Sequence, residues 1–125
     1  MRTLADVLVA LVALEHLWFL VLESFLWTRP LGLRTFHMSA EKAKESAALA
    51  ANQGTYNGFL AAGLVWSLAS TNQEFATAIA VFFLACVVVA GIVGAVTVSR
   101  RILVVQALPA TLALLVMLFA RPWSV

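Results

Sequence analysis

Four long runs of apolar residues follow one another along the chain, separated by short polar segments. They cover approximately residues 3–27, 49–69, 75–98 and 102–120. A helix needs about 20 mostly apolar residues to cross the hydrocarbon core of a bilayer, which is about 30 Å thick. None of the runs shows the alternation of a membrane β-strand, so we expect helices. The pattern predicts an all-α integral membrane protein, a four-helix bundle with up-down-up-down topology.

Composition agrees with a membrane protein of one domain. The chain has 125 residues, of which 63% are hydrophobic and 11% charged, with a mean hydropathy of +0.99. These values lie outside the range of soluble domains, and we expect a single domain over residues 1–125. The first run begins like a secretory signal, but it is too long and carries Glu15 and His16 at its centre, so we expect it to be retained.

The positive charges fall mainly in two of the connecting segments. Six of the eight Lys and Arg residues lie there: Arg29, Arg34, Lys42, Lys44, Arg100 and Arg101. Only Arg2 and Arg121 lie on the other side. Because short cytoplasmic loops are rich in Lys and Arg, we expect loops 29–48 and 99–101 in the cytoplasm and both termini outside. The basic residues are interpreted as topology signals, and no nucleic-acid partner is expected despite a net charge of +2.

Local signals refine the expected boundaries. Residues 31–38 are expected to be irregular, and Ser39 offers an N-cap for the second helix, whose first turns extend beyond the membrane. Thr71 with Glu74 three residues later matches a capping box for the third helix. Pro109 predicts a kink within the fourth.

Polar residues are concentrated in the first two runs. These residues are Glu15, His16 and Glu23 in the first run, and Asn52, Gln53, Tyr56 and Asn57 in the second. A charged residue in the middle of a membrane helix costs about 2.5 to 3.5 kcal/mol, whereas a Leu or Val returns only about 0.3 to 0.6 kcal/mol. Such residues therefore indicate a functional site.

Helical geometry sorts these residues into two faces. At about 100° per residue, His16 and Glu23 lie within about 20° of each other and about 10.5 Å apart along the axis. They can bracket a cavity but not pair directly, and Glu15 points about 100° away from His16. The four polar residues of the second run fall within an arc of about 140°. We therefore expect a ligand-binding pocket in the cytoplasmic half, formed by His16, Glu23, Asn52, Gln53, Tyr56, Asn57 and Glu15.

Three functions fit this pocket. The first is binding or transport of a small molecule or proton. The second is an intramembrane enzyme, an isomerase or hydrolase acting on a lipidic substrate, with His16 and Glu23 as acid and base. The third is a structural subunit of a membrane complex, in which the polar residues only join helices. No metal or cofactor is expected, because a metal needs three or four convergent ligands and the other histidine, His37, lies in a loop.

Small residues mark one face of the second run. Gly54, Gly58 and Ala62 recur every four residues, a spacing that permits close helix contact. The stripe predicts either packing inside the chain or a homo-oligomer.

Two segments carry a resemblance to a known family. They are His16-Leu17-Trp18-Phe19 with Leu22, Glu23, Phe25 to Trp27 and Phe36, and Asn52-Gln53-Gly54-Thr55-Tyr56-Asn57-Gly58-Phe59-Leu60. The chain resembles the family of small bacterial membrane proteins filed as domain of unknown function thirteen-oh-four. The resemblance implies four transmembrane helices in a bacterial inner membrane, and it implies no activity.

Overall fold

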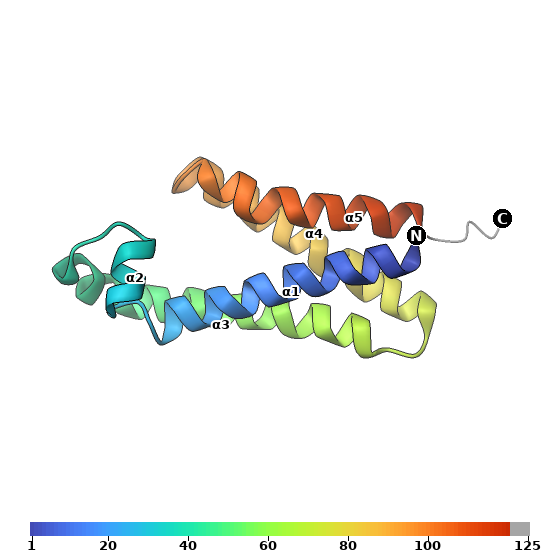
Figure 1. Ribbon diagram of the computed structural model, residues 1–125, viewed down its shortest axis with the longest axis horizontal. Coiled ribbons are helices and arrows are strands. Elements are labelled where there is room, and N and C mark those ends of the chain that lie inside the picture. The colour runs from blue at the N-terminus through green and yellow to red at the C-terminus, as the bar shows by residue number, and fades with distance from the viewer. Residues whose placement is uncertain (121–125) are drawn as a thin grey trace. The chain divides into compact units, whose positions relative to one another are not determined.

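All regular elements in residues 1–120, the part of the chain that the computed structural model describes, are helices (Figure 1). They are α1 (Arg2–Ser24), α2 (Pro30–Thr35), α3 (Ala40–Ala69), α4 (Gln73–Thr97), the π-helix η1 (Leu103–Ala107) and α5 (Leu108–Phe119). The predicted all-α class is confirmed. Arg121, one of the charges used to predict topology, lies outside the described residues.

Among the described residues, two helices are long and apolar enough to cross a bilayer. They are α1, with 23 residues, and α4, with 25 residues, and the segment Leu103–Phe119 is a shorter apolar helix. At 1.5 Å per residue, α1 and α4 are about 35 and 38 Å long, against a hydrocarbon core of about 30 Å. Only 28% of the most apolar stretch of each helix is buried within the chain, whereas the core helix of a soluble protein is mostly buried. Length and composition thus suggest a membrane location.

The chain divides into two compact units. One comprises Met1–Ala13 and the chain from Ala62 onward, and the other comprises Leu14–Ala61. Helices α1 and α3 each contribute to both units, which are described one at a time below.

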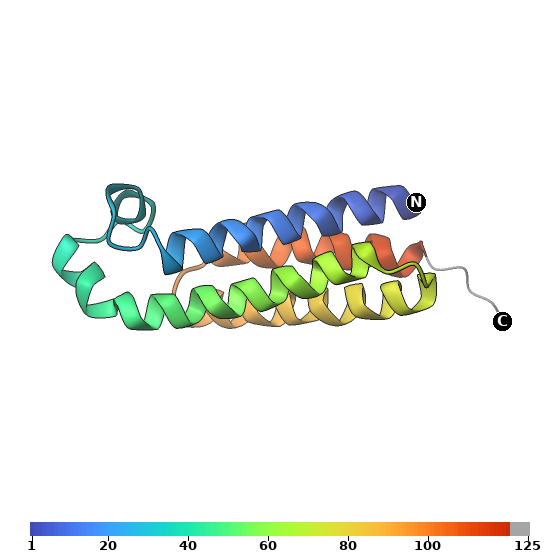
Figure 2. The ribbon, with the colours of Figure 1, turned by 90° about the horizontal axis from the view of Figure 1, so that it is seen from below.

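In the first unit, a short connection around Ser99 leads from α4 to η1, and η1 and α5 together run back along α4 in the opposite direction (Figures 1 and 2). The contact depends on a small residue. A Cβ atom on Gly91 would lie 2.9 Å from the backbone nitrogen of Ala107 and 3.0 Å from its Cα, so only glycine permits this approach. Leu84 and Met117 are among the side chains buried in this unit.

The start of α4 differs from the predicted capping box. Asn72 is the N-cap, and its side-chain oxygen accepts a hydrogen bond from the Phe75 nitrogen at 3.0 Å. The capping box predicted from Thr71 and Glu74 is therefore wrong, because Asn72, one position later, caps the helix and accepts from the backbone nitrogen three residues after it. Glu74 still lies in the first turn, where the helix dipole favours an acid.

The fourth apolar run is not a regular α-helix. Its first part is the π-helix η1, and Pro109 follows as the second residue of α5. Proline lacks a backbone N–H and crowds the carbonyl four residues earlier, and a wider turn relieves that clash. The kink predicted at Pro109 stays a prediction, and what the structure shows is a π-turn shortly before the proline. The Thr111 hydroxyl donates to the carbonyl of Ala107 at 2.7 Å.

In the second unit, the connection between α1 and α3 is more ordered than the sequence predicts. Helix α1 ends at Ser24, before the predicted end at residue 27. Helix α2 occupies most of residues 31–38, so the expectation of an irregular segment is wrong. Pro30 is the first residue of α2, a position that suits proline because its fixed φ favours helix and its missing N–H is not needed.

This connection is held against α3 by aromatic and hydroxyl side chains. The indole nitrogen of Trp27 donates to the Ser46 hydroxyl at 3.0 Å, and the Trp27 ring lies 4.6 Å from the Phe36 ring. Ser39 caps α3 as predicted, because its hydroxyl accepts from the Lys42 nitrogen at 3.2 Å. The predicted loop 29–48 thus contains α2 and the first turns of α3 packed together, and its cytoplasmic location stays a prediction.

Candidate functional site

A buried hydrogen bond between carboxyl and amide joins α1 to α3 in the second unit. The Asn57 side-chain nitrogen donates to Glu23 Oε2 at 2.8 Å, and both residues are 7% exposed. Glu23 lies in the last turns of α1, and Asn57 lies on the buried stripe of α3 that also contains Ala50, Gly54 and Ala61. Two of the predicted site residues, 34 positions apart in sequence, are thus in direct contact.

Close approach of the two helices depends on Gly54. A Cβ atom at this position would lie 3.1 Å from Glu23 Cβ and 3.1 Å from the Ser24 nitrogen, and it would overlap the Ser24 hydroxyl. Those neighbours include backbone, which cannot rotate away. The absence of a side chain at Gly54 therefore lets α1 approach α3 at the level of Glu23 and lets Asn57 reach the carboxyl.

The Ser24 hydroxyl lies beside this contact. Its oxygen is buried and makes no hydrogen bond within the described residues. Buried hydroxyls without a partner are uncommon in folded proteins, because the group loses its bonds to water. A carboxyl group can accept more than one hydrogen bond, and Asn57 supplies one. Sequence reasoning missed Ser24, although its position next to Glu23 could have drawn attention to it.

His16 shares the buried stripe of α1 with Glu23. Its side chain is fully buried, and its ring contacts Phe19 edge-on with 5.4 Å between the ring centres. The helix continues without a break from His16 to Glu23, so the two residues are about 10.5 Å apart along the axis. Glu15 is half-buried, and its Oε2 atom is buried without a hydrogen-bond partner in the described part of the chain.

The remaining predicted pocket residues lie elsewhere on α3. Asn52 and Gln53 are exposed, and Tyr56 is 60% exposed with its ring against Phe59. Asn52 is five residues from Asn57, which places it about 140° around the helix. The structure therefore brings Asn57 to Glu23 but does not bring these three residues to them.

The glycine stripe packs inside the chain. Gly54 lies against Glu23 and Ser24, and a Cβ on Gly58 would lie 3.4 Å from a methyl carbon of Leu20. Ala62 is exposed. The first two residues of the stripe thus serve the contact between α1 and α3. The oligomer predicted from Gly54, Gly58 and Ala62 stays a prediction, and an interface at this stripe would have to replace that contact.

The chemistry of this arrangement is that of a carboxyl group held away from water. Glu23 can accept hydrogen bonds, carry a charge or hold a proton, and the Ser24 hydroxyl can donate one hydrogen bond and accept others. Within residues 1–120, no three His, Cys, Asp or Glu side chains gather where they could share a metal ion. The site is thus suited to a proton or to a small molecule with a hydrogen-bond donor.

Comparison with known proteins gives a family. The model of a family described as a protein of unknown function (DUF1304) matches residues 10–118. The uncharacterized protein YpaA of Lactococcus lactis subsp. lactis (strain IL1403) is 30% identical over 117 residues, which are 92% of this chain and 97% of the relative. No solved structure matches. These matches confirm the resemblance read from the segments around His16 and Asn52, and the chain belongs to the DUF1304 family.

Proposed function

We propose that the chain is a multi-pass membrane protein that binds or transfers a proton or small polar molecule at Glu23, with Asn57 and Ser24 beside it. The observation that carries this proposal is the Glu23 carboxyl, buried in an apolar helix and hydrogen-bonded across to Asn57. Ionisable residues in membrane helices are costly and are typical of proton and substrate pathways. His16, fully buried on the same stripe of α1, would supply a second polar group deeper in the membrane.

The proposal includes the topology predicted from the charges: four passes, both termini outside, and loops 29–48 and 99–101 in the cytoplasm of a bacterial cell. Support comes from helices α1 and α4, and from the shorter apolar segment Leu103–Phe119. Helix α3 has 30 residues, about 45 Å, so it can cross the membrane and still extend beyond it.

The topology is open to a labelling test, because the chain has one cysteine, Cys86. In a Cys86→Ser background, Ser99→Cys should react with a membrane-impermeant maleimide only after the cells are opened. Ser70→Cys, in the turn between α3 and α4, should react in intact cells. Labelling of both sites from the same side would refute the four-pass arrangement.

Proton transfer is tested in proteoliposomes that contain a pH-sensitive dye and carry a potassium gradient clamped with valinomycin. Glu23→Gln keeps an oxygen that can accept from Asn57 but removes the ionisable group. Glu41→Gln, on an exposed residue in the first turn of α3, is the matched control. We expect wild type and Glu41→Gln to acidify the lumen and Glu23→Gln not to do so.

Equal flux through Glu23→Gln and wild type would remove Glu23 from the pathway. If wild type gives no flux above empty liposomes, proton transport is refuted, and only binding of a small molecule would remain of the proposal.

A second candidate, a subunit of a membrane assembly, is favoured by the exposed polar residues of α3. Asn52, Gln53 and Tyr56 would be costly against lipid, and amides pair readily across membrane helices. Cross-linking of Gln53→Cys to itself in membranes, with no cross-link from Val96→Cys on α4, would support a homo-oligomer through this face. Equal cross-linking of the two would refute it.

A further inference from the structure

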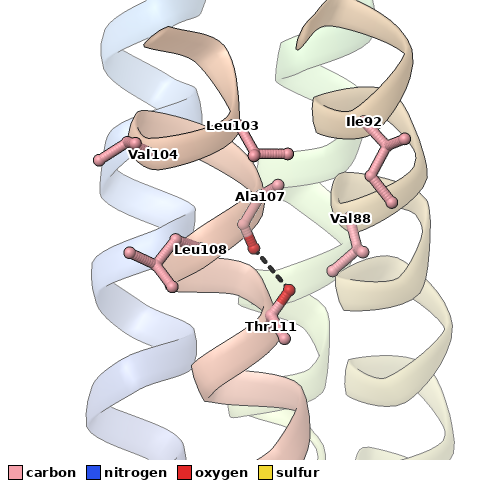
Figure 3. A pocket seen from close by; sticks show the side chains of 7 residues that line it. All are labelled: Val88, Ile92, Leu103, Val104, Ala107, Leu108 and Thr111. Carbon is pink, nitrogen blue, oxygen red and sulfur yellow. Dashed lines mark hydrogen bonds between the residues drawn. The ribbon is translucent and has the colours of Figure 1, made fainter. Parts of the chain in front are cut away.

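An open apolar groove lies in the first unit, where α4 faces η1 and the start of α5 (Figure 3). Its volume is about 280 Å³, and its lining consists of Val88, Ile92, Leu103, Val104, Ala107, Leu108 and Thr111. Thr111 is the polar member, but its hydroxyl already donates to the Ala107 carbonyl (Figure 3). The groove therefore offers an occupant hydrocarbon contact and no free polar side chain.

Two arginines stand at one end of this groove. Arg100 and Arg101 come three and two residues before Leu103, the first residue of this segment that lines the groove. Both arginines are exposed, and neither forms an ion pair with a side chain in the described residues. Two positively charged residues therefore lie next to one end of the apolar groove.

The length of the groove is close to the thickness of one leaflet of a bilayer. From Arg101 to Thr111 the segment rises by at most about 15 Å, the value for an α-helix, because the wider turn of η1 shortens it, and half of the hydrocarbon core is about 15 Å. The two arginines lie at the end of the groove that is next to the short connection around Ser99, where a membrane surface would lie. A molecule that fits this groove would have an anionic group at the membrane surface and a hydrocarbon chain as long as one leaflet is thick.

We propose that this groove binds one anionic phospholipid, with its phosphate at Arg100 and Arg101 and one acyl chain along Val104 and Leu108. The site is separate from the Glu23 site and rests only on the membrane location proposed above. Basic residues beside a membrane surface bind anionic headgroups, and each contributes about fivefold in affinity. The apolar lining holds the chain without selecting among headgroups.

The test uses purified protein in nanodiscs of phosphatidylcholine with increasing phosphatidylglycerol, with native mass spectrometry to count the lipids retained on the released protein. Both faces of a nanodisc are open, so a changed orientation of the variant does not affect the result. Wild type should retain one phosphatidylglycerol in preference to phosphatidylcholine. Arg100→Gln with Arg101→Gln should weaken that preference by about thirtyfold. Arg34→Gln, on an exposed arginine of α2, should not.

The groove is tested separately by filling it. Val104 is 62% exposed, so Val104→Trp adds bulk to the groove without entering the core, and the equally drastic Val96→Trp, at an exposed position of α4 that does not line the groove, is the control. We expect Val104→Trp to lose the retained lipid and Val96→Trp to keep it. Circular dichroism checks that both variants remain helical.

Retention without headgroup preference, or equal loss in both tryptophan variants, would mean that only bulk lipid surrounds the protein, and would overturn the proposal. Failure of wild type to integrate into nanodiscs would instead refute the membrane location itself. An integrated protein without a preferred lipid would refute this site and leave the Glu23 proposal standing.

Discussion

Replacing Gly54 by alanine tests the contact that positions Glu23. An added Cβ would lie 3.1 Å from both Glu23 Cβ and the Ser24 nitrogen, and would overlap the Ser24 hydroxyl. Overpacking of this kind costs about 1 to 3 kcal/mol, partly offset by the preference of helices for alanine over glycine, about 0.8 to 1 kcal/mol. Gly58→Ala is the matched control, since its Cβ would meet the flexible Leu20 side chain at 3.4 Å, an ordinary contact. It should gain the helix preference without the clash.

The two variants should therefore differ by about 1 to 3 kcal/mol in free energy of unfolding, with Gly54→Ala the less stable. The difference can be measured by reversible unfolding in bicelles, with steric trapping as the readout. Gly54→Ala should also separate Asn57 from Glu23 and lose any activity that depends on that contact. Equal or greater stability of Gly54→Ala would show that α1 and α3 do not approach at this residue, and the reasoning about the site would fail.

Two further predictions compare neighbouring polar residues. Asn57→Ala leaves the Glu23 carboxyl buried without its donor and should destabilise the protein by about 1 to 3 kcal/mol, whereas Asn52→Ala, on an exposed amide, should stay within about 0.5 kcal/mol in the same unfolding assay. Asn72→Ala removes the N-cap of α4 and should lower the free energy of unfolding by about 0.5 to 2 kcal/mol, whereas Thr71→Ala should have little effect. Thermal melts measure both variants. A larger loss of stability in Thr71→Ala than in Asn72→Ala would support the capping box predicted from the sequence.

The sequence predicted helices well because long apolar runs determine them. It was wrong about residues 31–38 and about the residue that caps α4, each for a local reason. Residues 31–38 were expected to be irregular, but Pro30 is favoured as the first residue of a helix, and α2 begins there. Overlapping capping signals at residues 71 and 72 cannot be ranked without knowing where the turn packs. The form of the irregularity near Pro109 was not predicted either, because a proline within a helix can be accommodated by a kink or by a wider turn, and here a π-turn precedes it.

The candidate site was predicted in part for a geometrical reason. An arc of about 140° on α3 is wider than the face that one neighbouring helix covers, so the amides could not all meet α1. The small residues Ala50, Gly54 and Ala61 mark the narrower buried stripe, and Asn57 is the amide that belongs to it. Combining the small-residue spacing with the polar pattern would have selected Asn57 over Asn52. Glu23 was selected as a candidate because ionisable residues are rare in apolar helices.

The most direct measurement of the central claim is infrared difference spectroscopy of the protein in lipid, recorded across a change of pH or addition of a ligand. A carboxyl band that changes in wild type and in Glu15→Gln but is absent in Glu23→Gln would show that Glu23 exchanges a proton or contacts the ligand, as the account predicts. A spectrum without any carboxyl change, or one that is unaltered in Glu23→Gln, would contradict it and make the bond between Glu23 and Asn57 a structural contact between helices.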